Sequence, residues 1–357
     1  MKYFGAFLLL IMISFSCNDD DTYYDGGSFF TSEYGTGDDN AHIESITQAF
    51  SVEAGGEEVC FTSLNGVEVC LNTTCLTDNG QPLGFGFVDV KYVEIFDRGD
   101  MLLGNKPAVG LVDGEQVILD SGGEFRVELF YQGEKLELDW YSPICDIKMT
   151  IPCQLTGDCN EEMSGWSGSV DQAGNFNWNL SDIVIQSPTI GLVAGVNGLT
   201  GNAVTVVDDN YEMIVQDLGW RNCDVLAQFD GPNIPITIEC NAFVVDENII
   251  DNWPEVDWEG LGSTFSFDNL NSRIGVAFPT VNTLMNMTGG ENSIFTQSLP
   301  SNEECDFILM APLDEDGEVF LYAVKNTIIG DDPNITISSN EILIGNKSEL
   351  LQVVNSL

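Results

Sequence analysis

From residue 46 onward the chain consists of short apolar runs separated by turn signals rich in glycine and asparagine. Within the longest run, Phe85 to Phe96 (FGFVDVKYVEIF), apolar and polar residues partly alternate. Alternation with a period of two is typical of strands that bury one face in a sheet. The pattern therefore predicts an all-β protein.

Two turn signals predict hairpins within this pattern. Asn65-Gly66 separates the apolar runs 59–62 and 67–71, and this dipeptide is the strongest short-range hairpin signal. Gln132-Gly133-Glu134 separates two further runs in the same way. We therefore expect antiparallel pairing between neighbouring strands at both places.

The final residues 347–357 (KSELLQVVNSL) follow a different period. Their apolar side chains recur on one helical face, and Asn346 or Ser348 can cap such a helix at its first turn. The sequence therefore predicts a short C-terminal helix packed on the last sheet.

Polar, acidic stretches interrupt the β pattern and divide the chain into segments. We expect tandem antiparallel β-sandwich modules that follow a signal peptide and a flexible tether. The predicted segments are a lipoprotein signal peptide over 1–16, a lipidated cysteine and flexible acidic tether over 17–45, β module 1 over 46–155, β module 2 over 160–245, a linker or long loop over 246–262, and β module 3 with the C-terminal helix over 263–357.

The N-terminus has the features of a bacterial lipoprotein signal. Lys2 precedes an uncharged, mostly apolar run that ends at Ser16, which is shorter than the about 20 residues needed to span a bilayer. Cys17 follows at once and is the predicted lipidation site, with the acidic stretch 18–21 behind it. This arrangement predicts a lipid anchor on the cell surface at the outer membrane. The alternative is a secreted protein in which Cys17 joins a disulfide.

The charge balance narrows the range of partners. Against 57 Asp and Glu residues the chain has 11 Lys and Arg residues, a formal net charge of −46. Nucleic-acid affinity depends on neutralising phosphates with Lys and Arg, so we expect no nucleic-acid partner. Anionic headgroups are repelled for the same reason, which leaves the lipid as the predicted contact with the membrane.

Nine cysteines follow Cys17, and in an exported chain disulfides are the expected state. Because the number is odd, at least one of them is a free thiol or pairs with another chain. We expect one pair within the first three, one within the next three, and one between Cys223 and Cys240. The cysteines are Cys60, Cys70, Cys75, Cys145, Cys153, Cys159, Cys223, Cys240 and Cys305.

Known catalytic and metal-binding patterns are largely missing, and we expect no enzyme, no metal and no cofactor. His42 is the one histidine and falls within the predicted tether, where it makes a poor partner for a nucleophile or zinc. Residues 314–318 (DEDGE) have glycine at the wrong position for an EF-hand loop and are predicted to form a hairpin turn. Asp257 and Glu259, which flank Trp258, leave a carboxylate pair open as an alternative.

Several phrases occur together in an order that resembles an uncharacterised family of exported and surface lipoproteins of Bacteroidetes. They are EIFDRGDMLLGNKP (94–107), SGGEFRVELFYQGEKLEL (121–138), MTIP (149–152), EEMSGWSGSVDQAGNFNWNL (161–180) and LGWRNCD (218–224). The resemblance covers about residues 50–357 and implies tandem immunoglobulin-like β-sandwich modules. It implies no reaction and no ligand.

These observations together predict a non-enzymatic, surface-anchored lipoprotein that acts as a binding or scaffold module, with a glycan or a surface protein as its partner. The sequence sets no oligomeric state. One alternative is a glycan-binding lipoprotein of a polysaccharide-uptake system, which predicts that Trp220, Trp253 and Trp258 face the ligand. A weaker alternative is a carboxylate-dependent hydrolase.

Overall fold

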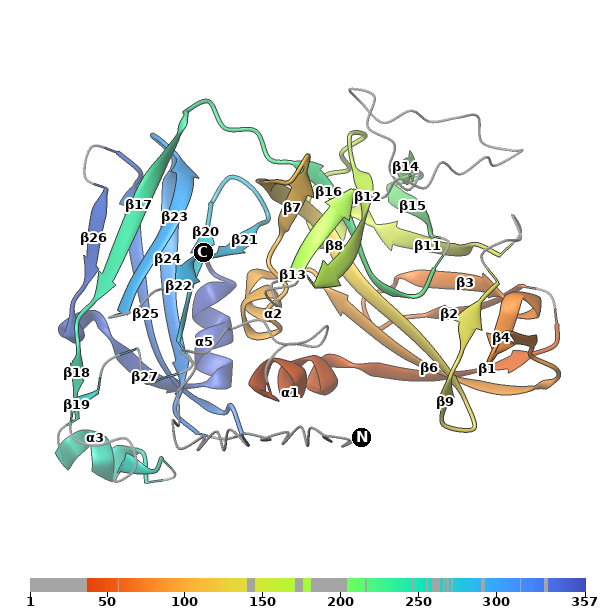
Figure 1. The fold of residues 1–357 in the computed structure, drawn as a ribbon, viewed down its shortest axis with the longest axis horizontal. Helices are drawn as coiled ribbons and strands as arrows, with labels where there is room; N and C mark the ends of the chain where they lie inside the picture. Colours follow the sequence, from red (N-terminus) through yellow and green to blue (C-terminus); the bar gives the residue numbers. More distant parts are fainter. Residues whose placement is uncertain are drawn as a thin grey trace, which may run out of the picture.

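A computed structural model describes most of the chain that follows the predicted tether (Figure 1). The described residues are 37–56, 58–139, 145–170, 176–180, 204–215, 217–245, 247–254, 256–258, 264–265, 267, 270, 272–289, 293–314, 316–330 and 333–357. The signal peptide predicted over 1–16 and the lipidation site Cys17 lie outside them. The described part is mostly β, with mainly antiparallel strand pairs and a short C-terminal helix, as the sequence predicts.

The N-terminal body, which we define by strands β1 to β16, contains an eight-stranded sheet with the order β1-β6-β8-β16-β12-β13-β7 and β9 beside β8. Because β7 pairs with both β13 and β8, the strands β8, β16, β12, β13 and β7 close into a ring. The bounds are β1 (Gln48–Ala54), β6 (Gly86–Ile95), β7 (Val109–Val112), β8 (Glu115–Tyr131), β9 (Glu134–Lys135), β12 (Ser164–Val170), β13 (Phe176–Leu180) and β16 (Gly219–Leu226).

Two smaller sheets complete this body. A five-stranded sheet has the order β14-β15-β11-β3-β2, and a three-stranded sheet has the order β10-β4-β5. Alternate residues of β6 and β8, such as Val90 and Val127, share a core with Met149 and Met213 from the five-stranded sheet. The bounds are β2 (Glu58–Thr62), β3 (Glu68–Asn72), β4 (Leu76–Asp78), β5 (Gln81–Pro82), β10 (Glu137–Leu138), β11 (Ile147–Pro152), β14 (Val204–Val207) and β15 (Asn210–Val215).

The boundary predicted between module 1 (46–155) and module 2 (160–245) does not separate two sets of sheets. Strand β8 of the first segment pairs with β16 of the second, and β11 pairs with β15. The polar stretch between the segments is a connection within one body, because the strands on either side bury their apolar faces in the same core.

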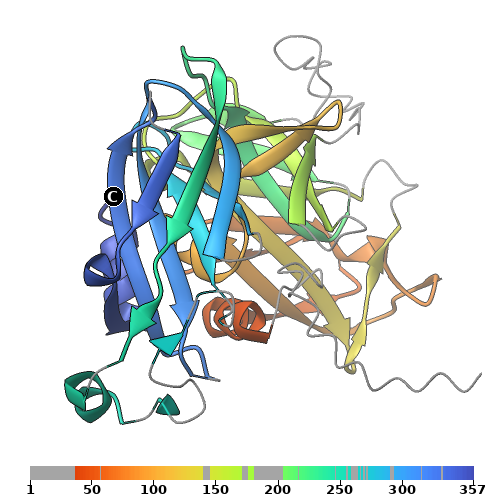
Figure 2. The same cartoon turned by 60° about the vertical axis from the view of Figure 1, so that its left-hand side comes forward.

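The C-terminal body contains a five-stranded sheet, β21-β20-β24-β25-β27, a four-stranded sheet, β22-β23-β17-β26, and the pair β18-β19 (Figures 1 and 2). Strand β17 was expected in module 2 but pairs here with β23 and β26. The bounds are β17 (Asn233–Cys240), β18 (Phe243–Val244), β19 (Thr264–Phe265), β20 (Arg273–Ala277), β21 (Leu284–Asn286), β22 (Thr288–Gly289), β23 (Ile294–Pro300), β24 (Glu304–Pro312), β25 (Val319–Ile328), β26 (Asn334–Ile337) and β27 (Leu343–Asn346).

The segment predicted as a linker over 246–262 packs, where it is described, on the C-terminal body. It holds the helix α3 (Glu247–Asn252), which lies at one end of that body (Figure 1). Trp258 is buried in the core, and its indole N–H donates to the carbonyl oxygen of Trp253 at 2.8 Å. These apolar contacts make the segment part of the fold rather than a spacer.

Three short helices lie at the junction of the two bodies (Figure 1). Helix α2 (Arg98–Leu103) packs against both α1 (Gly37–Ile46) and α5 (Lys347–Val354). The apolar residues Ile43 and Leu350 are fully buried and contact a core that includes side chains from both bodies. Among the described residues, no helix has the length and apolar character that a membrane crossing requires.

Local signals in the sequence are confirmed at the hairpins and at the C-terminus. Strands β2 and β3 flank Asn65-Gly66, and Gly66 has a φ of 89°, which glycine adopts without strain. Strands β8 and β9 flank Gln132-Gly133. Helix α5 begins after Asn346, whose side chain accepts from the Glu349 N–H at 2.9 Å, so Asn346 and not Ser348 is the cap.

The expected hairpin turn lies between β24 and β25, which pair antiparallel. The Asp314 carboxylate accepts hydrogen bonds from the N–H groups of Glu318 and Val319, both at 2.9 Å. One carboxylate oxygen of Asp314 is therefore used to close the turn.

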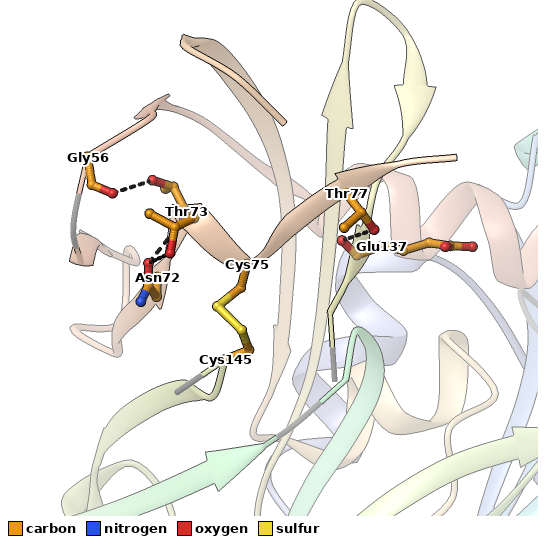
Figure 3. Close-up of a disulfide and its surroundings, with 8 residues drawn as sticks. Gly56, Asn72, Thr73, Cys75, Thr77, Glu137 and Cys145 are labelled. Carbon is orange, nitrogen blue, oxygen red and sulfur yellow. Dashed lines mark hydrogen bonds between the residues drawn. A yellow bond between two sulfur atoms is a disulfide. The ribbon is translucent and has the colours of Figure 1, made fainter. Parts of the chain in front are cut away.

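Three disulfides staple the N-terminal body: Cys60–Cys70, Cys75–Cys145 and Cys153–Cys159. The first and third fall within the groups of three that the sequence predicts. Figure 3 shows the second, which joins a cysteine of one group to a cysteine of the other. Strand β10 pairs with β4, and the Asp139 N–H donates to the Cys75 carbonyl oxygen, so this part of the chain lies beside Cys75. The predicted Cys223–Cys240 pair is wrong. Cys223 and Cys240 are buried thiols that lie in different cores. Cys305 is also a buried thiol.

Candidate functional site

A cleft of about 470 Å³ opens where the two bodies meet. Its walls come from the end of β6 and the start of α2, from the middle of β8, from the connection after β11, and from the loop between β20 and β21. Its polar lining residues are Asp97, Arg98, Asp120, Ser121, Thr156, Asp158, Asn160, Tyr211, Thr280, Asn282 and Asn355. We call this space the junction cleft.

Hydrogen bonds hold the two bodies together beside the junction cleft. The Arg98 guanidinium donates to the carbonyl oxygens of Phe278 and Val281 at 2.7 and 2.8 Å. Asn282 donates its backbone N–H to Asp120 at 2.7 Å and its side-chain amide to the Ser121 carbonyl at 2.9 Å. The loop of the C-terminal body is thus fixed on the N-terminal body, and the cleft is preformed.

Three aspartates give the junction cleft its acidic character. Burial raises the pKa of the Asp97 carboxyl, and the nearby Asp100 charge adds to this. Burial also raises the pKa of Asp120, while the N–H of Asn282 and the charge of Arg98 oppose the shift. Asp158 is exposed at the rim. Three carboxyl groups therefore face one guanidinium that is already bound to carbonyl oxygens.

Tyr211 fixes the rim of the cleft on the side of β15. Its hydroxyl accepts from the Asn160 N–H at 2.9 Å and lies 3.5 Å from the Asp158 carbonyl oxygen, to which it donates. The Cys153–Cys159 disulfide closes the same connection. The loop that carries Asp158 is therefore held in place by the Tyr211 hydroxyl and by the disulfide.

The chemistry of this arrangement suits an organic cation better than a metal ion. Carboxylates pair favourably with ammonium and guanidinium groups that reach them in a partly desolvated cleft. A metal site needs several ligand atoms close together, and in the described part of the chain three such residues converge only at Glu58, Cys60 and Cys70. The two cysteines of that group form a disulfide, so it offers no thiolate.

Two of the three tryptophans predicted to face a ligand are buried. Trp220 is 2% exposed and Trp258 is 8% exposed, so neither ring offers a face to a sugar. Trp253 is half-buried against the same core as Trp258. The prediction is wrong for Trp220 and Trp258, because Trp220 lies on β16 within a buried core and Trp258 packs into the core of the C-terminal body.

Trp220 belongs instead to a buried cluster of charges and rings, on the face of β8 and β16 opposite to that of Phe125 and Val127. The Lys106 ammonium lies 4.4 Å from the ring centre of Phe176 and 5.2 Å from that of Trp220. Glu124 is fully buried nearby, and burial, followed by the charge of Asp224, raises its pKa well above the ordinary range. The cluster is closed to solvent and has a structural role.

His42 does not lie in a flexible tether as predicted, because residues 37–46 form α1. The imidazole is 4% exposed, and its Nε2 lies 3.0 Å from Asp100 Oδ1. This contact joins α1 to α2. His42 therefore anchors a helix, and the tether can extend only over residues before 37.

The buried thiols give no reactive site. Desolvation raises the pKa of Cys223 well above its ordinary value and that of Cys305 to about 12. Thiols with raised pKa values hold little thiolate, which is the nucleophilic form. Of the carboxylate pair considered above, Asp257 is exposed and Glu259 lies outside the described residues.

Apart from Asp97, the acidic residues of the cleft carry no signal that sequence reasoning could use. Asp97, Asp120 and Asp158 are three of 57 acidic residues, and they come together through pairing between distant strands and the docking of the two bodies. Asp97 alone has a local signature, since its carboxylate caps α2 by accepting from the Asp100 N–H.

Comparison with known proteins adds little to this description. No protein-family model and no curated protein sequence matches the chain. Among solved structures, a gamma-CGTase from the alkalophilic Bacillus clarkii is similar at 10% identity and a TM-score of 0.18, over 81% of this chain and 40% of that chain. This chain thus spans less than half of that protein, and at such a TM-score the likeness supports no conclusion about fold or activity.

Proposed function

We propose that this chain is a non-enzymatic binding lipoprotein of the bacterial cell surface, anchored at the outer membrane through a lipid on Cys17. Its rigid part presents the junction cleft to a ligand that carries an ammonium or guanidinium group. The observation that carries this proposal is the preformed cleft itself, lined from both bodies and holding more carboxylates than cations. We also propose that the chain belongs to the family of Bacteroidetes surface lipoproteins that it resembles, and that its bodies are sandwich-like modules in tandem.

The alternatives have less support from the geometry. A glycan-binding site loses Trp220 and Trp258 as stacking platforms, since both are buried. A hydrolase needs two carboxylates available to a substrate. In the cleft, one oxygen of Asp97 caps α2 and one oxygen of Asp120 accepts from Asn282, so both groups already serve the structure.

The cleft is tested by ligand-dependent thermal stability, using arginine amide as the probe on the full chain with Cys17→Ala. A ligand that binds only the folded state raises the midpoint of unfolding. Asp158→Asn should reduce the shift because it removes an exposed carboxylate from the rim of the cleft. Asp113→Asn is the matched control, since Asp113 also is exposed but sits in the turn between β7 and β8. No shift, or equal shifts in both variants, would reject the cleft as the site.

The anchor is tested separately in cells. Cys17→Ala should move the protein from the membrane fraction to the soluble fraction, because a tether without lipid has no hold on the bilayer. If the variant stayed in the membrane fraction, the lipid anchor would be rejected while the cleft could still stand.

A further inference from the structure

Two exposed phenylalanines, Phe85 just before β6 and Phe87 near its start, lie at the end of the N-terminal body that is remote from the C-terminal body (Figure 1). Phe85 is 84% exposed and Phe87 is 69% exposed, whereas Val88 and Val90 on the opposite face are buried. Single exposed apolar residues are ordinary, but two large exposed rings two positions apart in the chain form a patch that indicates an interaction surface.

The Phe85 ring has a defined seat. A Cβ atom on Gly55 would come within 2.3 Å of it, so the ring lies directly on the glycine backbone. Gly55 has a φ of 96°, a conformation that glycine adopts readily. One face of the ring is thereby supported, and most of its surface remains open to solvent.

Two carboxylates flank Phe87. Glu53 on β1 is directly opposite Phe87, and Asp89 follows Phe87 on the same face of β6. Both acids are exposed. Directly opposite residues of an antiparallel pair have neighbouring side chains on one face of the sheet. We call Phe85, Phe87, Glu53 and Asp89 the β6 patch.

The basic residue nearest in register is already engaged. The Lys91 ammonium lies 3.7 Å from the Glu44 carboxylate and 5.7 Å from the ring centre of Phe130. The carboxylates of the β6 patch therefore dominate its charge, in a chain whose formal net charge is −46.

This charge decides which partner fits. A second copy of the chain would bring a like charge to the patch, and anionic lipids or nucleic acids would be repelled in the same way. A positively charged protein would be attracted over a distance and held by cation–π and ion-pair contacts once docked. Apolar side chains of such a partner would cover the rings.

We propose that the β6 patch docks a basic protein segment. An apolar side chain of the partner rests on Phe85 and Phe87, and an Arg or Lys side chain reaches Glu53 and Asp89. The patch is separate from the junction cleft, so the chain has a protein-binding surface whether or not the cleft binds a small cation.

A displayed library of random twelve-residue peptides tests this on the full chain with Cys17→Ala. Selected peptides should combine Arg or Lys with Leu, Phe or Trp, and a synthetic peptide from that set should bind at least tenfold more weakly to Phe85→Ser/Phe87→Ser. Ile328→Ser is the matched control, because Ile328 is 67% exposed but lies in the C-terminal body. Circular dichroism and the unfolding midpoint show whether each variant is folded.

The proposal is overturned if no basic, apolar class of peptide is enriched, or if the double variant binds the selected peptide as well as the unchanged chain. A panel of neutral oligosaccharides, tested in parallel, shows whether the patch binds a glycan instead of a protein segment. If an oligosaccharide bound and lost its binding in the double variant while no peptide was enriched, the patch would be a glycan site and the proposed partner would be wrong. The thermal-shift assay with arginine amide tests the junction cleft through Asp158→Asn. Its result can therefore fail or succeed separately from the test of the β6 patch.

Discussion

At the scale of single residues, the carboxyl groups buried on β8 and β16 set how stability depends on pH. Glu124 is fully buried, and its pKa in the folded chain is raised well above the ordinary value of 4.5, first by desolvation and then by the charge of Asp224. The folded state therefore binds more protons than the unfolded state above pH 4.5. Stability must fall as the pH rises toward the raised pKa.

Replacing Glu124 with Gln removes this loss, because the amide keeps the shape of the side chain and does not ionise. We expect Glu124→Gln to gain stability relative to the unchanged chain as the pH rises from 4.5 to 8, by about 1.4 kcal/mol for each unit by which the pKa is raised. Urea unfolding at several pH values measures it. Glu134→Gln, at an exposed position on β9, should show no such trend. A constant difference across this pH range would mean that Glu124 does not carry the effect.

At the scale of elements, the disulfides should contribute different amounts to the free energy of unfolding, according to the length of the loop that each one closes. Cys75–Cys145 spans 70 residues, whereas Cys153–Cys159 spans 6. Loop-closure entropy then gives about 4 kcal/mol for the first and about 2 kcal/mol for the second. Denaturant unfolding of Cys75→Ser/Cys145→Ser and of Cys153→Ser/Cys159→Ser should give losses in that order. The reverse order would show that the length of the closed loop matters less to stability than the packing around each disulfide.

The cap of α5 offers a second test at this scale. Asn346→Ala should cost about 1 kcal/mol, because its side chain accepts from the Glu349 N–H and the Glu349 carboxylate accepts from the Asn346 N–H. Ser348→Ala, two positions on, should stay within about 0.5 kcal/mol. Thermal unfolding compares the two variants with the unchanged chain. Equal effects would show that the capping box does not stabilise the helix.

The elements that follow from short stretches of sequence were predictable, and those that depend on distant partners were not. Asn65-Gly66 and the apolar face of 347–357 carry their structure locally, and both predictions are confirmed. The pairing of β17 with β26, and the Cys75–Cys145 link, depend on segments far apart in the chain. No local pattern encodes such pairings, so the predicted module boundaries followed polar stretches that prove to be connections within a body.

The same reason hides the candidate sites from the sequence. The junction cleft exists because Arg98 and Asp120 of one body bind the loop before β21 in the other, and the β6 patch exists because β1 places Glu53 opposite Phe87. Among 57 acidic residues, composition alone cannot single out those that gather. The tryptophans beside acids at 253–259 predict a group that faces a ligand, but burial in the core removes Trp258 from the surface.

At the scale of the whole molecule, net charge should limit stability. With 57 acidic and 11 basic residues, repulsion among carboxylates acts against the compact state at neutral pH. Ion pairs relieve only a few of them, such as Lys148 with Glu212 and Lys325 with Glu341. Dissolved salt screens repulsion over a distance that shrinks from about 10 Å at 0.1 M to about 3 Å at 1 M.

We therefore expect the unfolding midpoint at pH 7 to rise by several degrees between about 0.05 and 1 M NaCl, with most of the gain at the lower concentrations, where the screening length changes most. The control is the same series near pH 4.1, the isoelectric point of the sequence, where there is little net charge to screen. A flat midpoint at pH 7 would show that the acids are too far apart to repel strongly. An equal rise at both pH values would point to a general effect of salt on apolar burial, because only net charge makes the response depend on pH.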